Sequence, residues 1–173
     1  MYLKRLIYLS FKKHLTQVVK GGENMSLTIK SCYALRGLYE LYKLQNQQTQ
    51  DEEKIFVSIY NISENTEIPN EFLAKIFSEL KKAGIVDSGR GKFGGFNLTK
   101  NPEEIKLSEI VEALEVPLNS YDCVTKGDCP NQDTCPADFV WKRVQRAIFD
   151  ELSKITLKDI IEYGERKGNV SPI

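Results

Sequence analysis

The segment PNEFLAKIFSELKKAG, residues 69–84, decides the fold of this chain. Pro69 suits the first turn of a helix, where its missing backbone N–H is not needed, and Gly84 suits the position just after a helix ends. The apolar residues between them recur at helical spacing and predict the buried side of this helix: Phe72, Leu73, Ile76, Phe77 and Leu80. Lysines occupy several of the remaining positions, so the segment predicts an amphipathic, lysine-bearing helix.

A second, shorter helix is predicted just before this one. Ser58 suits the N-cap of a helix over residues 59–65, and residues 66–68 make a tight connection to Pro69. Two helices joined by about three residues form a helix-turn-helix pattern, in which the second helix enters the major groove of DNA. An ordinary pair of packed helices has the same pattern, so this pattern alone does not establish DNA binding.

A glycine-rich, basic hairpin is predicted directly after the second helix. Residues 85–86 and 96–98 form two short strands, and the segment between them contains Gly89, Arg90, Gly91, Lys92, Gly94 and Gly95. Glycines permit tight turns and close backbone approach, and Arg90 can reach phosphates or a minor groove. The common glycine-rich nucleotide-binding patterns are not matched. The hairpin therefore predicts the wing of a winged helix-turn-helix domain.

The remaining segments predict a mainly helical chain. Residues 27–44 and 107–114 read as amphipathic helices, and residues 55–57 as a short strand-like run. A long helix to about Ser153 is apolar on two sides, which favours a dimerisation helix, although one wide buried face in a monomer has a similar pattern. Thr156 suits the cap of a last helix that ends at Gly164.

The first 24 residues differ from the rest. They carry five basic residues and one acidic residue, but no apolar centre long enough for a signal peptide. Residues 20–24 can be encoded by a purine-rich, ribosome-binding sequence at natural spacing from Met25, which predicts that Met25 is the true start. A basic tail is the alternative. The predicted division is an N-terminal extension at residues 1–24, a DNA-binding domain at 25–100, and a cysteine loop with the dimerisation helix at 101–173.

Charge is distributed unevenly along the chain. The whole sequence has 24 basic and 24 acidic residues; setting aside the first 24 residues leaves 19 basic and 23 acidic, a net charge of −4. Residues 69–100 nevertheless carry six basic and three acidic side chains, a net of +3. A local basic face on an acidic protein suits contact with phosphates. No apolar run approaches the roughly 20 residues of a membrane span.

Three of the four cysteines lie within thirteen residues, at Cys123, Cys129 and Cys135. A disulfide framework is disfavoured in a chain expected to be cytoplasmic, where thiols stay reduced. Structural zinc usually takes pairs at closer spacing, whereas a five-residue spacing suits a loop around a larger group. Zinc or a redox thiol stays open as an alternative to such a larger group.

Several motifs together resemble the Rrf family of bacterial winged-helix regulators, which includes IscR-like and NsrR-like proteins. They are Leu27-Thr28 with Tyr33-Ala34-Leu35, the helix from Phe72 to Gly84, the wing from Arg90 to Phe96, and the three spaced cysteines. The resemblance covers about residues 25–164. It implies a homodimeric, cytoplasmic transcription factor whose binding to operator DNA is tuned by an iron-sulfur cluster, either 2Fe-2S or 4Fe-4S.

The resemblance also bears on the fourth cluster ligand. IscR-like members place a histidine three residues after the third cysteine, where this chain has Asp138, and the only histidine, His14, lies in the leader. NsrR-like members use a carboxylate early in the first helix, donated by the other subunit; its aligned position here is Cys32. We therefore predict Cys32 of the partner chain as the fourth ligand, with Asp138 or an exogenous ligand as alternatives. A buried, inert cysteine is the ordinary alternative for Cys32.

The predicted DNA-binding residues lie on the helix-turn-helix and the wing: Ser58, Asn70, Glu71, Ala74, Lys75, Arg90, Gly91 and Lys92. The four on the second helix are expected to face bases, and Arg90 and Lys92 the backbone or minor groove. Two departures from the family matter. Ala74 replaces a glutamate that discriminates among DNA sites in some IscR-like proteins, and Lys92-Phe93 replaces the usual Pro-Gly of the wing.

Three classes of function remain after this reading. The first is an iron-sulfur transcriptional regulator that senses redox state, nitric oxide, or cluster or iron status. The second is a winged-helix DNA-binding protein with a structural zinc or redox-thiol site, and the third an electron-transfer or cluster-handling protein without DNA. An enzyme is not expected, because no nucleophile-base pair and no histidine after Met25 are present. The expected partners are double-stranded DNA and a second copy of the chain, with no membrane.

Overall fold

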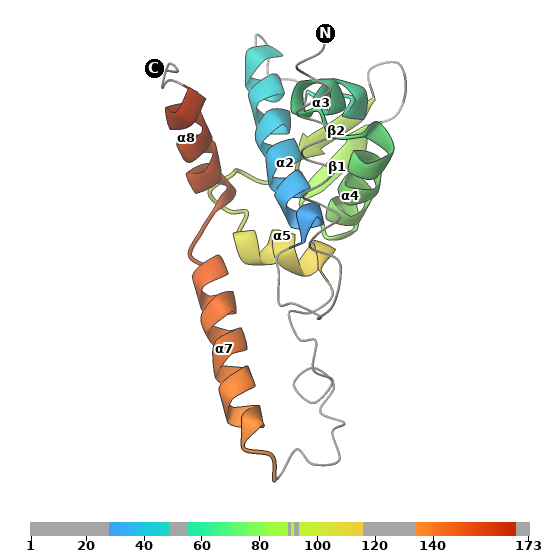
Figure 1. The fold of residues 1–173 in the computed structure, drawn as a ribbon. Helices are drawn as coiled ribbons and strands as arrows, with labels where there is room; N and C mark the ends of the chain where they lie inside the picture. Colours follow the sequence, from blue (N-terminus) through green and yellow to red (C-terminus); the bar gives the residue numbers. More distant parts are fainter. Residues whose placement is uncertain (1–27, 49–54, 90, 92–93, 116–133, 169–173) are drawn as a thin grey trace, which may run out of the picture.

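The computed structural model describes residues 28–48, 55–89, 91, 94–115 and 134–168 (Figure 1). Its elements, in chain order, are α2 (Ile29–Gln48), α3 (Ile59–Thr66), α4 (Asn70–Lys82), β1 (Val86–Gly89), β2 (Gly95–Leu98), α5 (Leu107–Leu114), α7 (Ala137–Leu152) and α8 (Leu157–Gly168). The predicted mainly helical fold with a small β-wing is confirmed. The predicted leader, Cys123 and Cys129 lie outside the described residues.

The helix-turn-helix is formed by α3 and α4. The hydroxyl of Ser58 accepts a hydrogen bond from the backbone N–H of Asn61 at 3.2 Å, which confirms Ser58 as the N-cap of α3. The turn after α3 begins at Glu67, whose φ of 57° is in the left-handed region. The hydroxyl of Ser63 donates to the carbonyl of Ile68 at 2.7 Å and holds this turn closed.

The end of α4 is a Schellman motif. Gly84 has a φ of 72°, the N–H of Ile85 donates to the Leu80 carbonyl at 3.0 Å, and the N–H of Gly84 donates to the Lys81 carbonyl at 3.0 Å. A residue with a Cβ atom is disfavoured at this φ, so glycine stops the helix here, as the sequence predicts.

The wing is a two-stranded antiparallel hairpin of β1 and β2. Val86 pairs with Leu98 and Gly89 with Gly95, so both strands extend further into the glycine-rich segment than predicted. Val57 adds an isolated bridge to Phe96, with backbone hydrogen bonds of 2.9 and 2.8 Å. A Cβ atom on Gly95 would lie 2.3 Å from the Val57 carbonyl oxygen, so only glycine permits this approach.

One hydrophobic core joins both sides of the predicted domain boundary at residue 100. Phe77 of α4 is fully buried and packs edge-to-face on Phe96 of the wing, with ring centroids 5.0 Å apart. The same core contains Ile110 of α5 and Leu157 of α8. The structure thus builds one core from residues that the sequence assigned to two domains, while the boundary itself stays a prediction.

Three details of the predicted helices are wrong. The helix predicted to end at residue 44 continues, as α2, to Gln48. Phe72 was placed on the buried side of α4, but its side chain is 37% exposed. The last helix does not end at Gly164; α8 continues to Gly168. A Cβ atom on Gly164 would lie 2.8 Å from Cε2 of Tyr39, so this glycine permits close contact between α8 and α2 rather than ending a helix.

The long helix α7 extends away from the rest of the chain, and only its C-terminal end lies near the body of the molecule (Figure 1). Near that end, Leu152 packs with Leu107 and Val111 of α5. Of the 16 residues of α7, all of them described, Leu152 alone is buried. Phe139, Val140 and Phe149 are 68%, 49% and 42% exposed. One wide face buried within the monomer is therefore excluded for this helix.

We expect Gly95→Ala to lower the free energy of unfolding by about 1–3 kcal/mol, because its Cβ atom would displace the backbone of Val57. Loss of amide hydrogen-exchange protection at Val57 and Phe96 would locate the damage. Gly91→Ala is the control: its φ of 98° strains the hairpin turn, but nothing lies within 4 Å of the added Cβ atom. Equal protection of Val57 in both variants would contradict this account.

Candidate nucleic-acid interface and cysteine site

The exposed side of α4 presents most of the residues predicted to contact DNA bases. Asn70, Glu71 and Lys75 are exposed and Ala74 is half-buried, all within the first two turns of the helix. Leu73 and Ile76 on the opposite side are buried in the core. The core thus fixes the rotation of α4 and turns the predicted residues outward.

Phe72 also belongs to this exposed surface, although it was not predicted there. Its ring packs edge-to-face against Tyr33 of α2, with centroids 5.6 Å apart, and the rest of the ring remains accessible. An exposed aromatic ring in the first turn of such a helix can contact a thymine methyl group. Helical periodicity could not separate Phe72 from its buried neighbour Leu73, because both lie within the same apolar stripe.

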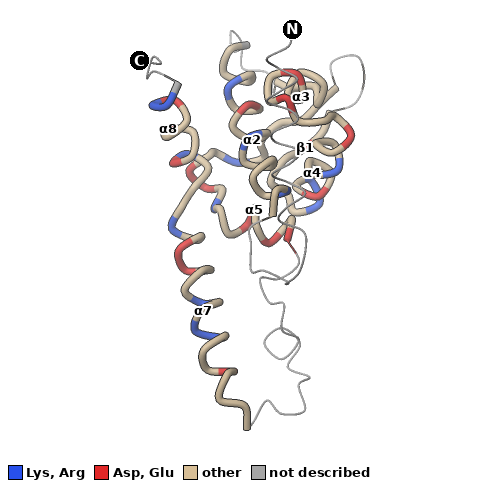
Figure 2. Tube along the Cα trace, in the orientation of Figure 1, with Lys and Arg blue, Asp and Glu red and all other residues tan. Residues whose placement is uncertain are grey.

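The other predicted DNA contacts lie around α3 and the wing. Ser58 is half-buried, and its hydroxyl caps α3. Gly91 is exposed at the hairpin turn, while Arg90 and Lys92 lie outside the described residues. Lys81 of α4 donates a hydrogen bond to the hydroxyl of Ser88 and so ties the helix to the wing. Basic segments lie along α4, on the side of the molecule away from α8 (Figure 2).

The described cysteines occupy the beginnings of two different helices. Cys32 lies in the first turn of α2 and is exposed, so the alternative of a buried, inert cysteine is excluded. Cys135 is half-buried, two residues before α7. Within one chain these two helix beginnings lie well apart (Figure 1). In the described ranges, no group of three or more histidine, cysteine or acidic side chains is arranged to hold a metal ion.

Asp138 lies in the first turn of α7, next to Cys135. Its backbone N–H donates to the Cys135 carbonyl at 3.3 Å, and its Oδ2 forms an ion pair with Lys142 at 2.9 Å. Its other oxygen, Oδ1, is buried and has no hydrogen-bond partner within the described part of the chain. A buried carboxylate oxygen without a partner is costly, so this atom is suited to accept a ligand.

Glu115, which caps the end of α5, holds the beginning of α2. Its Oε1 accepts hydrogen bonds from the backbone N–H of Thr28 at 3.1 Å, the hydroxyl of Thr28 at 2.7 Å and the hydroxyl of Ser31 at 2.5 Å. Burial alone would raise the pKa of Glu115, but the hydrogen bonds from Ser31 and Thr28, with the nearby charge of Lys30, hold the pKa below its ordinary value. The carboxylate therefore stays ionised at a helix N-terminus, where negative charge is favoured.

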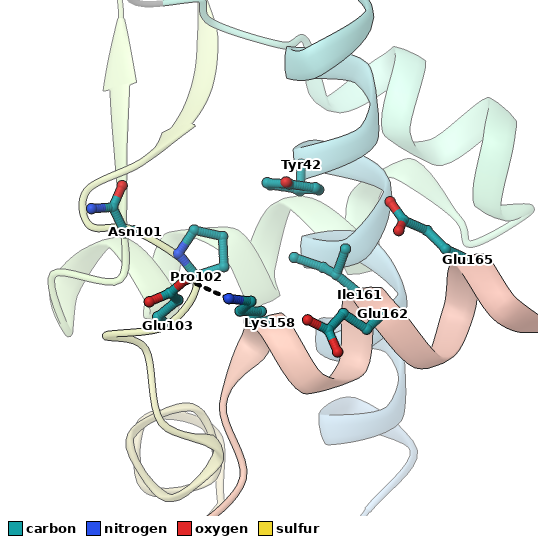
Figure 3. Close-up of a pocket in the computed structure, with 8 residues that line it drawn as sticks. All are labelled: Tyr42, Asn101, Pro102, Glu103, Lys158, Ile161, Glu162 and Glu165. Carbon is teal, nitrogen blue, oxygen red and sulfur yellow. Dashed lines mark hydrogen bonds and ion pairs between the residues drawn. The ribbon is translucent and has the colours of Figure 1, made fainter.

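A hollow of about 400 Å³ lies between α2, α8 and the segment before α5 (Figure 3). It is lined by Tyr42, Asn101, Pro102, Glu103, Lys158, Ile161, Glu162 and Glu165. Its one lysine, Lys158, is paired with Glu103 at 2.5 Å. The remaining charges are acidic and repel phosphate, so this hollow is not part of the nucleic-acid surface.

None of the helices in the described ranges is long and apolar enough to cross a membrane.

Comparison with known proteins agrees with this architecture. The family model described as Rrf2, iron-dependent transcriptional regulator, matches residues 27–163. The chain is 31% identical over 141 residues to the HTH-type transcriptional regulator IscR of Vibrio campbellii, covering 82% of this chain and 80% of that protein.

Two solved structures have the same fold. The T. potens IscR structure is 26% identical, with a TM-score of 0.60, over 88% of this chain and 97% of that chain. The structure of CymR, the global cysteine regulator of B. subtilis, is 26% identical, with a TM-score of 0.59, over 80% of this chain and 97% of that chain.

These relatives are regulators of transcription and not enzymes, and regulators of this family bind DNA. The helix-turn-helix, the wing and the outward face of α4 give this chain the corresponding structure. The chain belongs to the Rrf2 family of transcriptional regulators.

Proposed function

We propose that this protein is a homodimeric transcriptional regulator whose DNA binding responds to an iron-sulfur cluster. The three spaced cysteines carry the proposal, and the family description of an iron-dependent regulator supports it. The signal would be redox state, nitric oxide, or cluster or iron status. Because no described helix could span a membrane and the thiols must stay reduced, we place the protein in the cytoplasm.

In this proposal the exposed face of α4 enters the major groove. Asn70, Glu71 and Lys75 contact base edges, and the ring of Phe72 supplies an apolar surface for a thymine methyl group. Ala74 offers no carboxylate, so operator preferences of relatives with a glutamate there do not transfer. The remaining proposed contacts with DNA come from the start of α3, at Ser58, and from the wing, at Arg90, Gly91 and Lys92.

Dimerisation is assigned to α7. The helix exposes two phenylalanines and a valine and buries one residue in its own chain. An isolated helix of 16 residues is marginal in water, so packing against a second copy would stabilise it. A two-fold symmetric pair would also place two recognition helices for a palindromic operator.

The cluster ligands in this proposal are Cys123, Cys129, Cys135 and, from the partner chain, Cys32. The donor chemistry fits, because thiolates are the ordinary ligands of iron-sulfur clusters and the described thiols of Cys32 and Cys135 are free. The separation of the first turn of α2 from the start of α7 within one chain supports ligation across a dimer (Figure 1). When bound, a cluster would supply a redox-active centre whose gain or loss changes the local charge.

Asp138 is the alternative fourth ligand. Its buried Oδ1 has no hydrogen-bond partner among the described residues, lies on the residue that hydrogen-bonds the Cys135 carbonyl, and needs no second chain. The ion pair of Oδ2 with Lys142 would still be available while Oδ1 bound a ligand. The two candidates for the fourth ligand are therefore Cys32 of the partner chain and Asp138 of the same chain, and substitution of each residue distinguishes them.

A second candidate function is a winged-helix regulator with a structural zinc or redox-thiol site. The similarity to CymR, the global cysteine regulator of B. subtilis, favours it, and a staphylococcal CymR has been solved in an oxidised form. Anaerobic purification separates the two: bound iron and sulfide with visible absorbance support the cluster, whereas a colourless zinc protein or a metal-free thiol protein supports the alternative.

We expect Lys75→Gln to weaken binding to DNA from upstream of its own operon about tenfold and to reduce the salt dependence by about one counterion. Fluorescence anisotropy at several salt concentrations measures both. Lys154→Gln is the matched control, because Lys154 lies beyond α7 and, in the described part of the chain, forms its ion pair with the exposed Glu151. Unchanged affinity and salt slope for Lys75→Gln would exclude a role for this lysine.

Phe149→Asp should raise the dimer dissociation constant by at least about 30-fold, because a buried interface aromatic commonly contributes 2 kcal/mol or more and a charge adds a desolvation cost. Sedimentation equilibrium measures the change. Glu112→Asp, an exposed acidic residue on α5, is the control. An undiminished dimer in Phe149→Asp would remove this residue of α7 from the interface.

Cys32→Ala should lower the iron and sulfide content per chain and change the visible spectrum, whereas Asp138→Ala should leave both as in the wild type. Anaerobic reconstitution with ferrous iron and sulfide, followed by metal analysis and absorption spectroscopy, tests this. The reverse pattern would assign the fourth ligand to Asp138. No change in either variant would assign it to an exogenous group.

A further inference from the structure

Polar contacts join three elements that are far apart in the sequence: the end of α5, the first turn of α2 and the recognition helix α4. We call this group the Glu115 junction. It consists of Thr28, Lys30, Ser31, Glu79, Leu114 and Glu115. The first half of the junction is the carboxylate of Glu115, which holds the beginning of α2 through three hydrogen bonds.

The second half of the junction is Lys30. Its Nζ donates a hydrogen bond to the carbonyl of Leu114 at 2.8 Å and forms an ion pair with Oε2 of Glu79 at 2.5 Å. The Leu114 carbonyl is at the C-terminal end of α5, where a positive charge is favoured. Glu79 belongs to the helix that presents the DNA-binding face. One ammonium group therefore holds the end of α5 and α4 together.

Every contact of the junction connects separate elements. Glu115 and Leu114 reach residues 84 to 87 positions earlier, and none of these contacts lies within a single helix. Hydrogen bonds of the N–H···O type keep donor–acceptor distances of roughly 2.7–3.2 Å and weaken steeply at poor angles. Because the three hydrogen bonds to Glu115 share one oxygen atom, a displacement of Glu115 beyond this range would break them together.

Two residues of the Glu115 junction directly precede proposed cysteine ligands, or the segment that carries them, in the sequence. Glu115 is directly followed by residues 116–133, which carry Cys123 and Cys129. Ser31 is directly followed by Cys32, whose backbone N–H donates to the Thr28 carbonyl at 3.4 Å. Cys32 and the segment that carries Cys123 and Cys129 thus each directly follow a residue of the Glu115 junction.

We propose that Glu115 and Lys30 are positioning residues that couple the cysteine segment to the recognition helix. This inference rests on the proposed function, because it names the route by which cluster state reaches DNA binding. A shift at the start of the cysteine segment moves Glu115 and the Leu114 carbonyl. Thr28 and Ser31 then lose their shared acceptor, Lys30 loses one of its two partners, and α2 and α4 change position together.

The test compares the DNA affinity of protein reconstituted anaerobically with ferrous iron and sulfide with that of iron-free protein. In the wild type we expect these affinities to differ at least about tenfold, within the usual range of allosteric coupling. Glu115→Ala and Lys30→Met should reduce the ratio to about threefold or less, with iron and sulfide per chain unchanged. If the two residues only stabilise the fold, the substitutions should weaken DNA binding by the reconstituted and the iron-free protein equally, and the ratio of the two affinities should not change.

Two further variants sharpen the test. Glu115→Gln keeps a carbonyl oxygen that can accept the hydrogen bonds of Thr28 and Ser31, so it should restore part of the ratio. The double variant Glu115→Ala/Lys30→Met should reduce the ratio no further than either single change, because both act on one route. Lys30→Met removes the charge but keeps most of the length of the side chain, and it tests the inference even where Glu115→Ala fails to fold.

Lys158→Met is the matched control, because Lys158 forms an ion pair of the same length with Glu103 at a different place on the chain. It should keep the wild-type ratio. Wild-type ratios in both Glu115→Ala and Lys30→Met would overturn the coupling while leaving cluster sensing intact. A wild-type ratio near one, with the cluster present, would instead contradict sensing itself, and the inference with it.

Discussion

The contact of Phe77 with α2 at Gly37 is the constraint on which the DNA-binding surface depends. A Cβ atom on Gly37 would lie 2.9 Å from Cε2 of Phe77 and 3.1 Å from Cδ1 of Leu73, so α4 can lie this close to α2 only because position 37 is a glycine. The ring of Phe77 then reaches Phe96 of the wing. One aromatic side chain thus sets the relative positions of the helix and the hairpin that we propose contact DNA, and it turns Lys75 and its neighbours outward.

Much of this fold could be predicted because its stop and start signals are local. Ser58, Gly84 and Thr156 act on backbone groups within a few residues of themselves; the N–H and hydroxyl of Thr156, for example, donate to Asp159 at 2.8 and 2.7 Å. The errors arose where a distant residue decided the outcome. Gly164 carries the usual helix-ending signal, but contact with Tyr39 of α2 gives it another role. Phe72 fits the apolar stripe, yet the neighbouring Tyr33 covers only part of its ring.

The candidate site was predictable to the same extent. The outward residues of α4 follow from helical periodicity, and the cysteine spacing is visible in the sequence. The Glu115 junction was not predictable, because its partners are 49 to 87 residues apart and no short pattern marks a glutamate that caps another helix. The burial of Oδ1 of Asp138, which has no hydrogen-bond partner in the described ranges, was equally unpredictable, since it depends on the three-dimensional surroundings of the start of α7.

The proposed dimer would explain two unusual features of the single chain. Single exposed apolar residues are ordinary on protein surfaces, but α7 buries one of its 16 residues and projects from the body of the molecule. Cys32, meanwhile, is exposed at the start of α2, apart from the start of α7 where Cys135 lies. A second copy packed along α7 would cover the apolar side chains and could bring its own α2 to the cysteine segment. The surface that stabilises the dimer and the surface that completes the cluster site would then be continuous, so dimerisation and cluster binding should strengthen each other.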